Sequence, residues 1–218
     1  MRVVFLGAPG VGKGTQAERI ASQYRLAKIS TGDLLREAVR NKTTLGLEAK
    51  SFMDQGQLVP DSVVIGLVRE KLGDSSCANG FVLDGFPRTV PQAEELGKAL
   101  SGKSTALDLV VNFQVSREDV VRRLSGRRSC PKCQATFHID FAKPKVDEVC
   151  DRCGDSLVQR NDDRRDAIET RLKVYDEQTA PLVRYYEERR LLSSVDASGS
   201  VDVVFEHLAK VLTPFLAR

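Results

Sequence analysis

Four glycines and a lysine lie close together near the start of the chain, in a pattern suited to binding phosphate. The segment Gly7-Ala8-Pro9-Gly10-Val11-Gly12-Lys13 has the spacing G-x-x-x-x-G-K, between an apolar run and a helical pattern. Glycines let backbone N–H groups surround an oxyanion, a helix N-terminus adds partial positive charge, and lysine reaches the outer phosphates. A glycine-rich turn with an incidental lysine is the weaker alternative. The loop departs from the general pattern because Gly14 follows the lysine and the hydroxyl comes one place later, at Thr15.

Four of the five cysteines form two C-x-x-C pairs, a pattern typical of a metal site. Cys130 and Cys133 make the first pair, and Cys150 and Cys153 make the second, with 16 residues between the pairs. Two thiolate pairs on tight turns can complete a tetrahedral shell, which predicts structural Zn²⁺, with iron as a less favoured ion. Disulfides are disfavoured in a cytoplasmic chain, whereas a zinc ribbon that binds nucleic acid is a more serious alternative. The fifth cysteine, Cys77, has no partner in this pattern.

An acidic and a basic side chain follow the apolar run that begins at Phe81. Asp84 ends that run, and the segment Gly85-Phe86-Pro87-Arg88 comes directly after it. If the run is a buried strand, Asp84 can orient Mg²⁺ through its waters and the planar fork of Arg88 can hold a phosphoryl group. The alternatives are a helix cap for Asp84 and a surface charge for Arg88. Arginine is also dense over residues 117–128 and 152–171, which could converge on one anionic ligand.

These candidates accompany short β-rich runs that alternate along the chain with stretches of helical spacing. Such alternation predicts an α/β fold, in which a parallel sheet carries helices on both faces and ligands gather at the carboxyl ends of the strands. The five predicted strands are Val3–Leu6, Ala27–Ser30, Phe81–Asp84, Leu109–Gln114 and Leu191–Asp196.

The ends of several helices also have sequence signals. Pro181 is expected to kink or restart a long helix near the C-terminal end. Three further helices are predicted to begin at caps, formed by Ser30 with Asp33, by Asp61 after Pro60, and by Thr89 with Gln92 in a capping-box pattern.

Two segments depart from the alternation of strands and helices. Residues 30–59 are mostly helical and lack a strand, whereas residues 126–163 lose the helical period and carry the four paired cysteines. We therefore predict a core made of residues 1–29, 60–125 and 164–218, interrupted by a helical insertion and by a small metal-binding insertion.

The composition disfavours several classes of protein. A chain of 218 residues with 29% charged and 41% hydrophobic residues is typical of a globular protein. A net charge of +3 is too small to indicate a nucleic-acid or membrane partner, and no apolar run approaches the roughly 18 residues of a spanning helix. Because the first strand begins without a secretory signal before it, we expect a cytoplasmic protein, and we expect a monomer.

Six motifs together carry a resemblance to a known family. They are GAPGVGKGT from Gly7, Ser30-Thr31-Gly32-Asp33-Leu34-Leu35-Arg36, Gly56-Gln57-Leu58-Val59-Pro60-Asp61, Asp84-Gly85-Phe86-Pro87-Arg88, Gly126-Arg127-Arg128 and Arg160-Asn161-Asp162-Asp163. In this combination they resemble the adenylate kinases, within the nucleoside monophosphate kinases, over nearly the full chain. The resemblance implies a P-loop kinase fold with a five-stranded parallel sheet, an NMP-binding insertion at residues 30–59 and a zinc-stapled lid at residues 126–163.

The resemblance also implies a reaction, the reversible Mg²⁺-dependent conversion of ATP and AMP into two ADP by direct in-line transfer. A closing lid would exclude water and align donor with acceptor, and fixed cations would stabilise the spread charge. The partners would be these nucleotides, with Mg²⁺ accompanying ATP and structural Zn²⁺ in the lid. A kinase of different base specificity, such as a GTP:AMP enzyme, is the nearest alternative. A nucleotide-regulated zinc-ribbon protein that binds nucleic acid is the other.

By the same resemblance, three groups of residues take roles at the two nucleotide sites. Thr31 and Gln92 also fit helix caps, and Asp162 and Asp163 are expected either to pair with arginines or to cap a helix. The catalytic group is Lys13, Asp84, Arg88, Arg123, Arg127, Arg160, Asp162, Asp163 and Arg171. The ATP group is Gly10, Val11, Gly12, Lys13, Gly14, Thr15, Arg123, Arg127, Thr136, Phe137 and Gly199. The AMP group is Thr31, Arg36, Gln57, Leu58, Val59, Gly85, Phe86, Pro87, Arg88, Gln92, Arg160 and Arg171.

Overall fold

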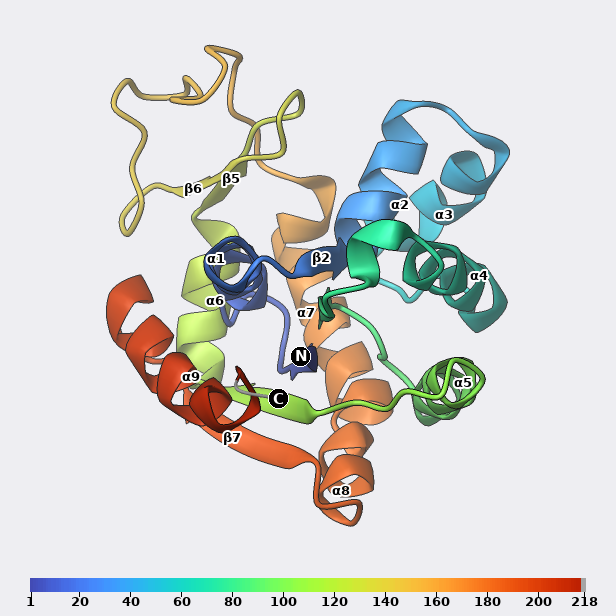
Figure 1. The fold of residues 1–218 in the computed structure, drawn as a ribbon. Coiled ribbons are helices and arrows are strands. Elements are labelled where there is room, and N and C mark those ends of the chain that lie inside the picture. Colours follow the sequence, from blue (N-terminus) through green and yellow to red (C-terminus); the bar gives the residue numbers. More distant parts are fainter. Residues whose placement is uncertain (217–218) are drawn as a thin grey trace.

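A five-stranded parallel sheet lies at the centre of the molecule (Figure 1). The computed structural model describes residues 1–216. The strands are short runs rich in β-branched and aromatic residues, as expected for a sheet buried on both faces. All five predicted strands are confirmed, with bounds that differ from the prediction by at most one residue. In spatial order, the strands are β2 (Ala27–Ser30), β3 (Phe81–Asp84), β1 (Arg2–Leu6), β4 (Leu109–Gln114) and β7 (Leu192–Asp196).

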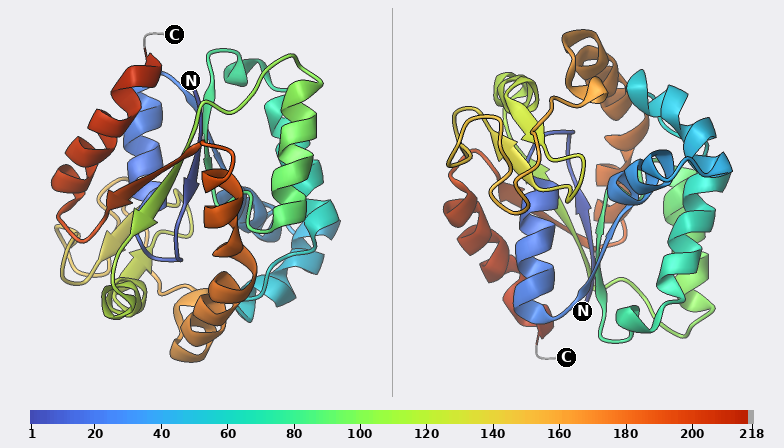
Figure 2. Two further views of the ribbon diagram at one scale, coloured as in Figure 1. Left: turned by 90° about the horizontal axis from the view of Figure 1, so that it is seen from below. Right: turned by 90° about the horizontal axis from the view of Figure 1, so that it is seen from above.

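Successive side chains of the strands pack into two separate hydrophobic cores. Val3 and Phe5 point to one face of the sheet, whereas Val4 and Leu6 point to the other. Figure 2 shows helices on both faces. The first face packs against α1 (Lys13–Tyr24), α6 (Arg117–Ser125) and α9 (Val201–Leu216), and the second packs against α4 (Asp61–Leu72), α5 (Val90–Ser101) and α8 (Pro181–Glu187).

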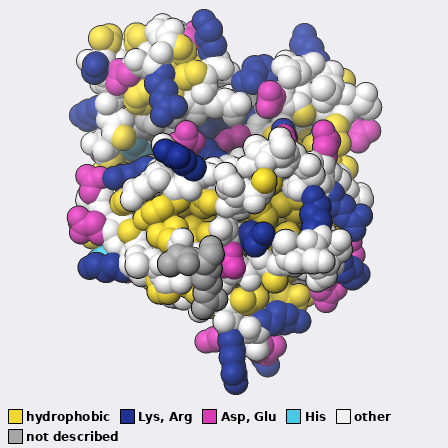
Figure 3. All heavy atoms as spheres, in the orientation of Figure 1, with side chains coloured by type: hydrophobic (Ala, Val, Ile, Leu, Met, Phe, Trp, Pro, Cys, Tyr) yellow, Lys and Arg dark blue, Asp and Glu magenta, His cyan; other side chains and the backbone are white. Residues whose placement is uncertain are grey.

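Two excursions lie at the edge of the sheet where the strands end. The first contains α2 (Thr31–Arg40) and α3 (Thr44–Asp54), and the second contains the antiparallel strands β5 (Arg127–Ser129) and β6 (Thr136–His138). In the space-filling view they form two lobes, with Lys and Arg side chains in the gap between them (Figure 3). The two lobes come from the segments in which the sequence departs from the alternation of strands and helices.

The two lobes touch each other. The Arg40 guanidinium, at the end of α2, donates to the carbonyl oxygen of Pro131 at 3.2 Å, and the Asn161 amide donates to the Asp54 carboxylate at 3.1 Å. The remaining elements are the short helices η1 (Ser75–Cys77) and η2 (Asn161–Asp163), the helix α7 (Arg165–Val174) and the π-helical turn η3 (Tyr175–Thr179). Within residues 1–216, no helix is long and apolar enough to cross a bilayer.

Two of the predicted helix caps are confirmed. The Ser30 hydroxyl accepts from the backbone N–H of Asp33, and the Thr89 hydroxyl accepts from that of Gln92, each at 3.3 Å. As expected, α8 begins at Pro181, directly after the turn η3 and Ala180.

The cap predicted at Asp61 is wrong. Pro60 occupies the N-cap position of α4, and no side chain caps that helix. The Asp61 carboxylate instead accepts from the Thr89 hydroxyl at 2.8 Å and from the Gln92 amide at 2.7 Å. Two side-chain donors from α5 and the residue before it therefore take the place of one backbone donor, and α4 and α5 are joined.

Candidate active site

Glycines shape the loop between β1 and α1. Gly7, Gly10 and Gly12 have φ angles of 137°, 85° and 102°, which other residues rarely adopt. A Cβ on Gly7 would lie 2.7 Å from the carbonyl oxygen of Phe113, so the loop approaches β4 more closely than a side chain permits. Gly12 is the N-cap of α1 and supplies no side-chain acceptor, while Thr15 in the first turn is exposed. The first amides of α1 are thus available to an anion.

Lys13 begins α1 and folds back over this loop. Its Nζ atom donates to the carbonyl oxygens of Gly7 at 2.7 Å and Ala8 at 2.9 Å. Burial lowers the pKa of Lys13 to about 8, and repulsion from Arg88 and two further arginines adds to the shift. An anionic ligand would relieve this repulsion.

Asp84 and Arg88 lie beside the loop, where β3 ends. A Cβ on Gly14 would lie 3.2 Å from Asp84 Oδ2, so the carboxylate packs against the first turn of α1. Arg88 Nε donates to the carbonyl oxygen of Gly85 at 2.8 Å, and the Thr179 hydroxyl donates to the carbonyl oxygen of Arg88 at 2.8 Å. Burial lowers the pKa of Arg88. Gly14, which departs from the general loop pattern, therefore leaves room for the Asp84 carboxylate.

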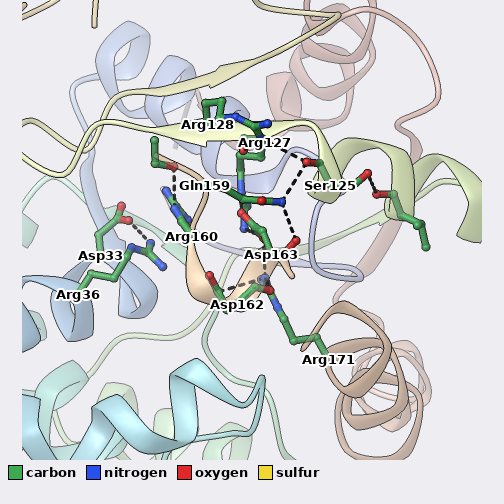
Figure 4. Close-up of polar contacts among 12 residues, drawn as sticks. Asp33, Arg36, Ser125, Arg127, Arg128, Gln159, Arg160, Asp162, Asp163 and Arg171 are labelled. Carbon is green, nitrogen blue, oxygen red and sulfur yellow. Dashed lines mark hydrogen bonds and ion pairs between the residues drawn. The ribbon is translucent and has the colours of Figure 1, made fainter. Parts of the chain in front are cut away.

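Two acids bind the arginines at the base of the second lobe (Figure 4). Asp163 accepts from Arg127 Nε at 2.8 Å, from the Arg127 terminal nitrogen at 2.5 Å and from Arg171 at 3.0 Å. Arg171 also pairs with Asp162 at 3.1 Å. Burial alone would raise the pKa of Asp162, but Arg171 and Arg127 hold it below its ordinary value. The expected pairing of both acids with arginines is present.

Arg160 and Arg36 reach toward each other from the two lobes (Figure 4). Arg160 Nε donates to the Ser129 hydroxyl at 2.7 Å, and burial, together with Arg36 and Arg127, lowers the pKa of Arg160 to about 9. Arg36 hydrogen-bonds to Asp33, yet its Nε atom is buried with no partner among the described residues. These partly buried cations would be stabilised by an anionic ligand.

An open hollow of about 600 Å³ lies beside α2, α3 and the end of β3. Its lining combines guanidinium groups with apolar side chains, as is common in small-molecule sites. Most of the residues predicted to contact AMP line it, namely Thr31, Arg36, Gln57, Leu58, Val59, Gly85, Arg88, Gln92 and Arg171.

The other predicted AMP residues lie around this hollow. Phe86 is 1% exposed and packs in the core, so only the backbone of Phe86 and Pro87 is suited to face a ligand there. Arg160 lines a neighbouring hollow, which also contains Arg36. Gln92 lines the main hollow, but its Oε1 atom accepts from the backbone N–H of Arg88 at 2.7 Å while its Nε2 atom is bound to Asp61.

The residues predicted near the adenine of ATP come from three elements. Arg123, on α6, donates to the carbonyl oxygens of Val11 at 3.2 Å and Ala197 at 2.8 Å. It therefore joins the phosphate loop to the loop after β7, which contains Gly199. Thr136 is exposed on β6, whereas Phe137 is partly buried against the cysteines.

The four paired cysteines form one cluster. Their Sγ atoms lie within 4.8 Å of one another, with Cys130 and Cys153 at 3.4 Å and Cys133 and Cys150 at 3.5 Å. All four are free thiols rather than disulfides. Tetrahedral Zn²⁺ with Zn–S bonds of about 2.3 Å places sulfurs roughly 3.8 Å apart, so the residues fit that ion.

Comparison with known proteins decides the family. A family model described as adenylate kinase matches residues 5–191. The chain belongs to the adenylate kinase family. The adenylate kinase of Geobacter sp. (strain M21) is 52% identical over 204 residues, which are 94% of this chain and 95% of that protein. The adenylate kinase of Methanothrix thermoacetophila is 50% identical over 215 residues, 99% of this chain and 100% of that protein.

Membership of the adenylate kinases confirms the resemblance seen in the motifs and the predicted P-loop kinase fold. Adenylate kinases transfer a phosphoryl group between ATP and AMP, and the chain is accordingly an ATP:AMP phosphotransferase. The relatives favour neither a kinase of other base specificity nor a nucleic-acid-binding protein.

Several residues of this adenylate kinase site were not predicted from the sequence. Leu35, Met53 and Val64 form the apolar wall of the hollow. Leu35 lies one turn after Thr31 on α2, so an inward-facing stripe is a signal that could have identified it. Ser129 and Thr179, which hold Arg160 and the Arg88 carbonyl, have partners 31 and 91 residues away and no local signal.

Proposed function

We propose that this adenylate kinase binds ATP on the loop of residues 7–13 and AMP in the hollow beside α2, α3 and residues 85–88. One observation carries the proposal: Lys13, the phosphate-loop lysine, lies close enough to Arg88, Arg127 and Arg171 for their charges to lower its pKa. The phosphate ends of both nucleotides would meet among these cations.

The transfer would be direct and in line, without a covalent enzyme intermediate. Lys13, Arg88, Arg127, Arg160 and Arg171 would stabilise the charge that spreads over the transferring phosphoryl group. Asp162 and Asp163 would hold two of these arginines in position through their ion pairs. Arg123, bound to the carbonyl oxygens of Val11 and Ala197, would fix the donor side of the site.

We further propose three functional units. Residues 1–29, 60–125 and 164–218 form the core, residues 30–59 form the NMP-binding insertion, and residues 126–163 form the lid. The position of both lobes at the edge where the strands end supports this division (Figure 2). Closure of the lobes over the nucleotides would exclude water, which otherwise competes as an acceptor.

Mg²⁺ would accompany ATP and neutralise charge on its phosphates. Asp84 is the fitting residue, because its carboxylate oxygen lies against Gly14 at the start of α1 and can hold the waters of the ion. Thr15, next along the chain, is the nearest hydroxyl of the loop pattern.

Zn²⁺ would be structural, held by Cys130, Cys133, Cys150 and Cys153. The donor set supports this role, since four thiolates close a tetrahedral shell and leave no position for a substrate. Iron is the alternative ion for the same set of ligands.

A coupled assay of ADP formation tests the proposal. ATP with AMP is expected to be turned over, and GMP, CMP, UMP or GTP in place of one nucleotide is expected to support far less turnover. Lys13→Ala should lower kcat/KM by about 10²–10³-fold, because it removes a charge acting on the transition state. Equal turnover of several base combinations would overturn the base assignment, and an unchanged kcat/KM for Lys13→Ala would overturn the role of the loop.

We also propose a cytoplasmic monomer that binds neither nucleic acid nor membrane. The net charge of +3 supports it, because it provides little attraction for polyanions. Light scattering at working concentration should give the mass of one chain, 24.1 kDa. A dimer mass, or retention on anionic vesicles at physiological salt, would contradict this part of the proposal.

A further inference from the structure

His138 is buried, and both of its ring nitrogens are engaged. It ends strand β6 and is 7% exposed. Nδ1 accepts from the backbone N–H groups of Asp140 at 2.9 Å and Phe141 at 3.2 Å. Because two donors point at Nδ1, this atom carries a lone pair and the proton of the neutral ring is on Nε2. Nε2 lies 3.3 Å from the carbonyl oxygen of Arg122, to which it therefore donates.

This hydrogen bond crosses the point where the second lobe leaves the core. Arg122 lies in the last turn of α6, whereas His138 lies in the lobe, directly opposite Arg127 in the β5–β6 pairing. The Arg122 carbonyl oxygen also accepts from the backbone N–H of Gly126 at 3.2 Å, and the Ser125 hydroxyl lies 3.2 Å from it and 2.9 Å from the carbonyl oxygen of Val121. Ile139 adds a backbone bond to the carbonyl oxygen of Gly126 at 3.0 Å.

The ring of His138 is also fixed by packing. Its centroid lies 4.4 Å from that of Phe141, in a stacked arrangement, and the Arg122 guanidinium lies over Phe141 at 4.6 Å. Gly126 faces the ring so closely that a Cβ there would overlap Nε2 and Cε1 of His138. The first residue of the lid segment must therefore lack a side chain as long as the imidazole is present.

We propose that His138 is a positioning residue, whose neutral Nε2–H tautomer fixes strand β6 on the last turn of α6. The consequence lies on the donor side of the active site. Helix α6 carries Arg123, while the β5–β6 pair carries Arg127, Thr136 and Phe137. His138 thus sets the position of the β5–β6 residues relative to Arg123. The inference rests on the proposed function, because it is that proposal which assigns these residues to ATP.

Substitution of His138 by asparagine and by glutamine separates the acceptor role of Nδ1 from the donor role of Nε2. The shorter amide of His138→Asn can reach the position of Nδ1 and keep the acceptor for Asp140 and Phe141, but it cannot reach the Arg122 carbonyl. The longer amide of His138→Gln can reach the position of Nε2 and keep that donor. His138→Asn is expected to raise KM for ATP about fivefold, the size expected for one hydrogen bond, with KM for AMP unchanged. His138→Gln is expected to retain most of the ATP affinity.

His207 provides the matched control. It is the only other histidine of the chain and is exposed on α9. His207→Asn should leave both KM values unchanged. The ring ¹⁵N shifts of the wild-type protein should show His138 as the neutral Nε2–H form, whereas His207 should show the averaged shifts of an exposed ring. An Nδ1–H form for His138 would overturn the proposal.

A double-mutant cycle tests the contact with Gly126. The Cβ that Gly126→Ala introduces meets ring atoms that asparagine lacks, and the next neighbour, Ile139 Cγ1, is 3.1 Å away. Gly126→Ala should therefore raise KM for ATP in the presence of His138 and have a much smaller effect beside His138→Asn.

The possible outcomes distinguish this inference from the proposed function. Additive effects of the two substitutions, or equal KM values for His138→Asn and wild type, would overturn the positioning role while wild-type ADP formation still stands. Equal increases in KM for ATP and AMP would show a general loss of folding, and would also overturn it. Absence of ADP formation by the wild-type chain would instead overturn the proposed function itself.

Discussion

Arg127 and Asp163 form a two-point ion pair, in which Arg127 Nε and a terminal nitrogen lie 2.8 and 2.5 Å from the two carboxylate oxygens. The Asp163 side chain is 0% exposed, and Arg171 binds it as well at 3.0 Å. A buried carboxylate thus holds two guanidinium groups near Lys13, in the proposed phosphate site. Such an acid offsets positive charge that nucleotide phosphates would offset in a complex.

Replacing this acid should destabilise the protein. Asp163→Asn keeps the shape but removes the charge, which leaves Arg127 without its carboxylate partner and Arg171 with Asp162 alone. The free energy of unfolding should fall by about 3–5 kcal/mol. Urea unfolding measures the change. A bisubstrate compound in which two adenosines are joined through phosphates should, at saturation, reduce the difference in unfolding free energy between variant and wild type. Asp147→Asn, on an exposed part of the same segment, is the control and should have no effect.

Deprotonation of Lys13 should lower kcat/KM at alkaline pH. Its pKa of about 8 lies below the ordinary value of 10.5, so the free enzyme loses this positive charge as the pH rises through 8. Since the proposed ATP site needs the protonated form, kcat/KM for ATP should be constant below pH 8 and fall about tenfold per pH unit above it. Bound phosphate raises the pKa of Lys13, and kcat should therefore remain constant to higher pH. A kcat/KM profile that stays flat to pH 10 would contradict this assignment.

Removal of the metal from the cysteine cluster should lower thermal stability. Without the ion, the two C-x-x-C turns lose the bonds that join them, and the lobe has few other buried groups. Chelation should lower Tm by about 5 °C or more, corresponding to roughly 2 kcal/mol. Metal content is measured alongside: Cys133→Ser should lose the ion, whereas Cys77→Ser should retain one per chain. An unchanged Tm after proven removal would argue against a structural ion.

Replacing Asp61 should raise KM for AMP, although Asp61 does not line the hollow proposed for AMP. It holds the Gln92 amide at 2.7 Å, and Gln92 lines the hollow proposed for AMP. Asp61→Ala removes the acceptor of the Gln92 amide and that of the Thr89 hydroxyl. Because the bond to Gln92 is the one beside the hollow, KM for AMP should rise about fivefold, the size expected for one hydrogen bond, while KM for ATP is unchanged. Glu70→Ala, exposed on the same helix, is the control. Equal KM values for AMP in Asp61→Ala and Glu70→Ala would show that AMP binding does not depend on the hydrogen bond between Gln92 and Asp61.

Several features of this protein follow from local sequence alone. The five strands follow from short apolar runs, and the phosphate loop follows from glycines at positions that need positive φ. The cysteine cluster follows from two C-x-x-C pairs, since each pair already places two sulfurs on one turn. In each case the residues that decide the structure are neighbours in the chain, and the conformation they favour needs no distant partner.

Other features depend on residues that only the fold brings together. Asp61 looks like a helix cap in sequence, but its donors lie 28 and 31 residues further along the chain. Arg123 looks like a free phosphate ligand, yet it donates to the carbonyl oxygens of Val11 and Ala197, which are 112 and 74 residues away. A polar side chain binds whichever donor or acceptor it is buried beside, and spacing along the chain does not encode that neighbour. The sequence by itself therefore determined the elements and the chemistry available, and tertiary packing decided which partner each charged side chain has.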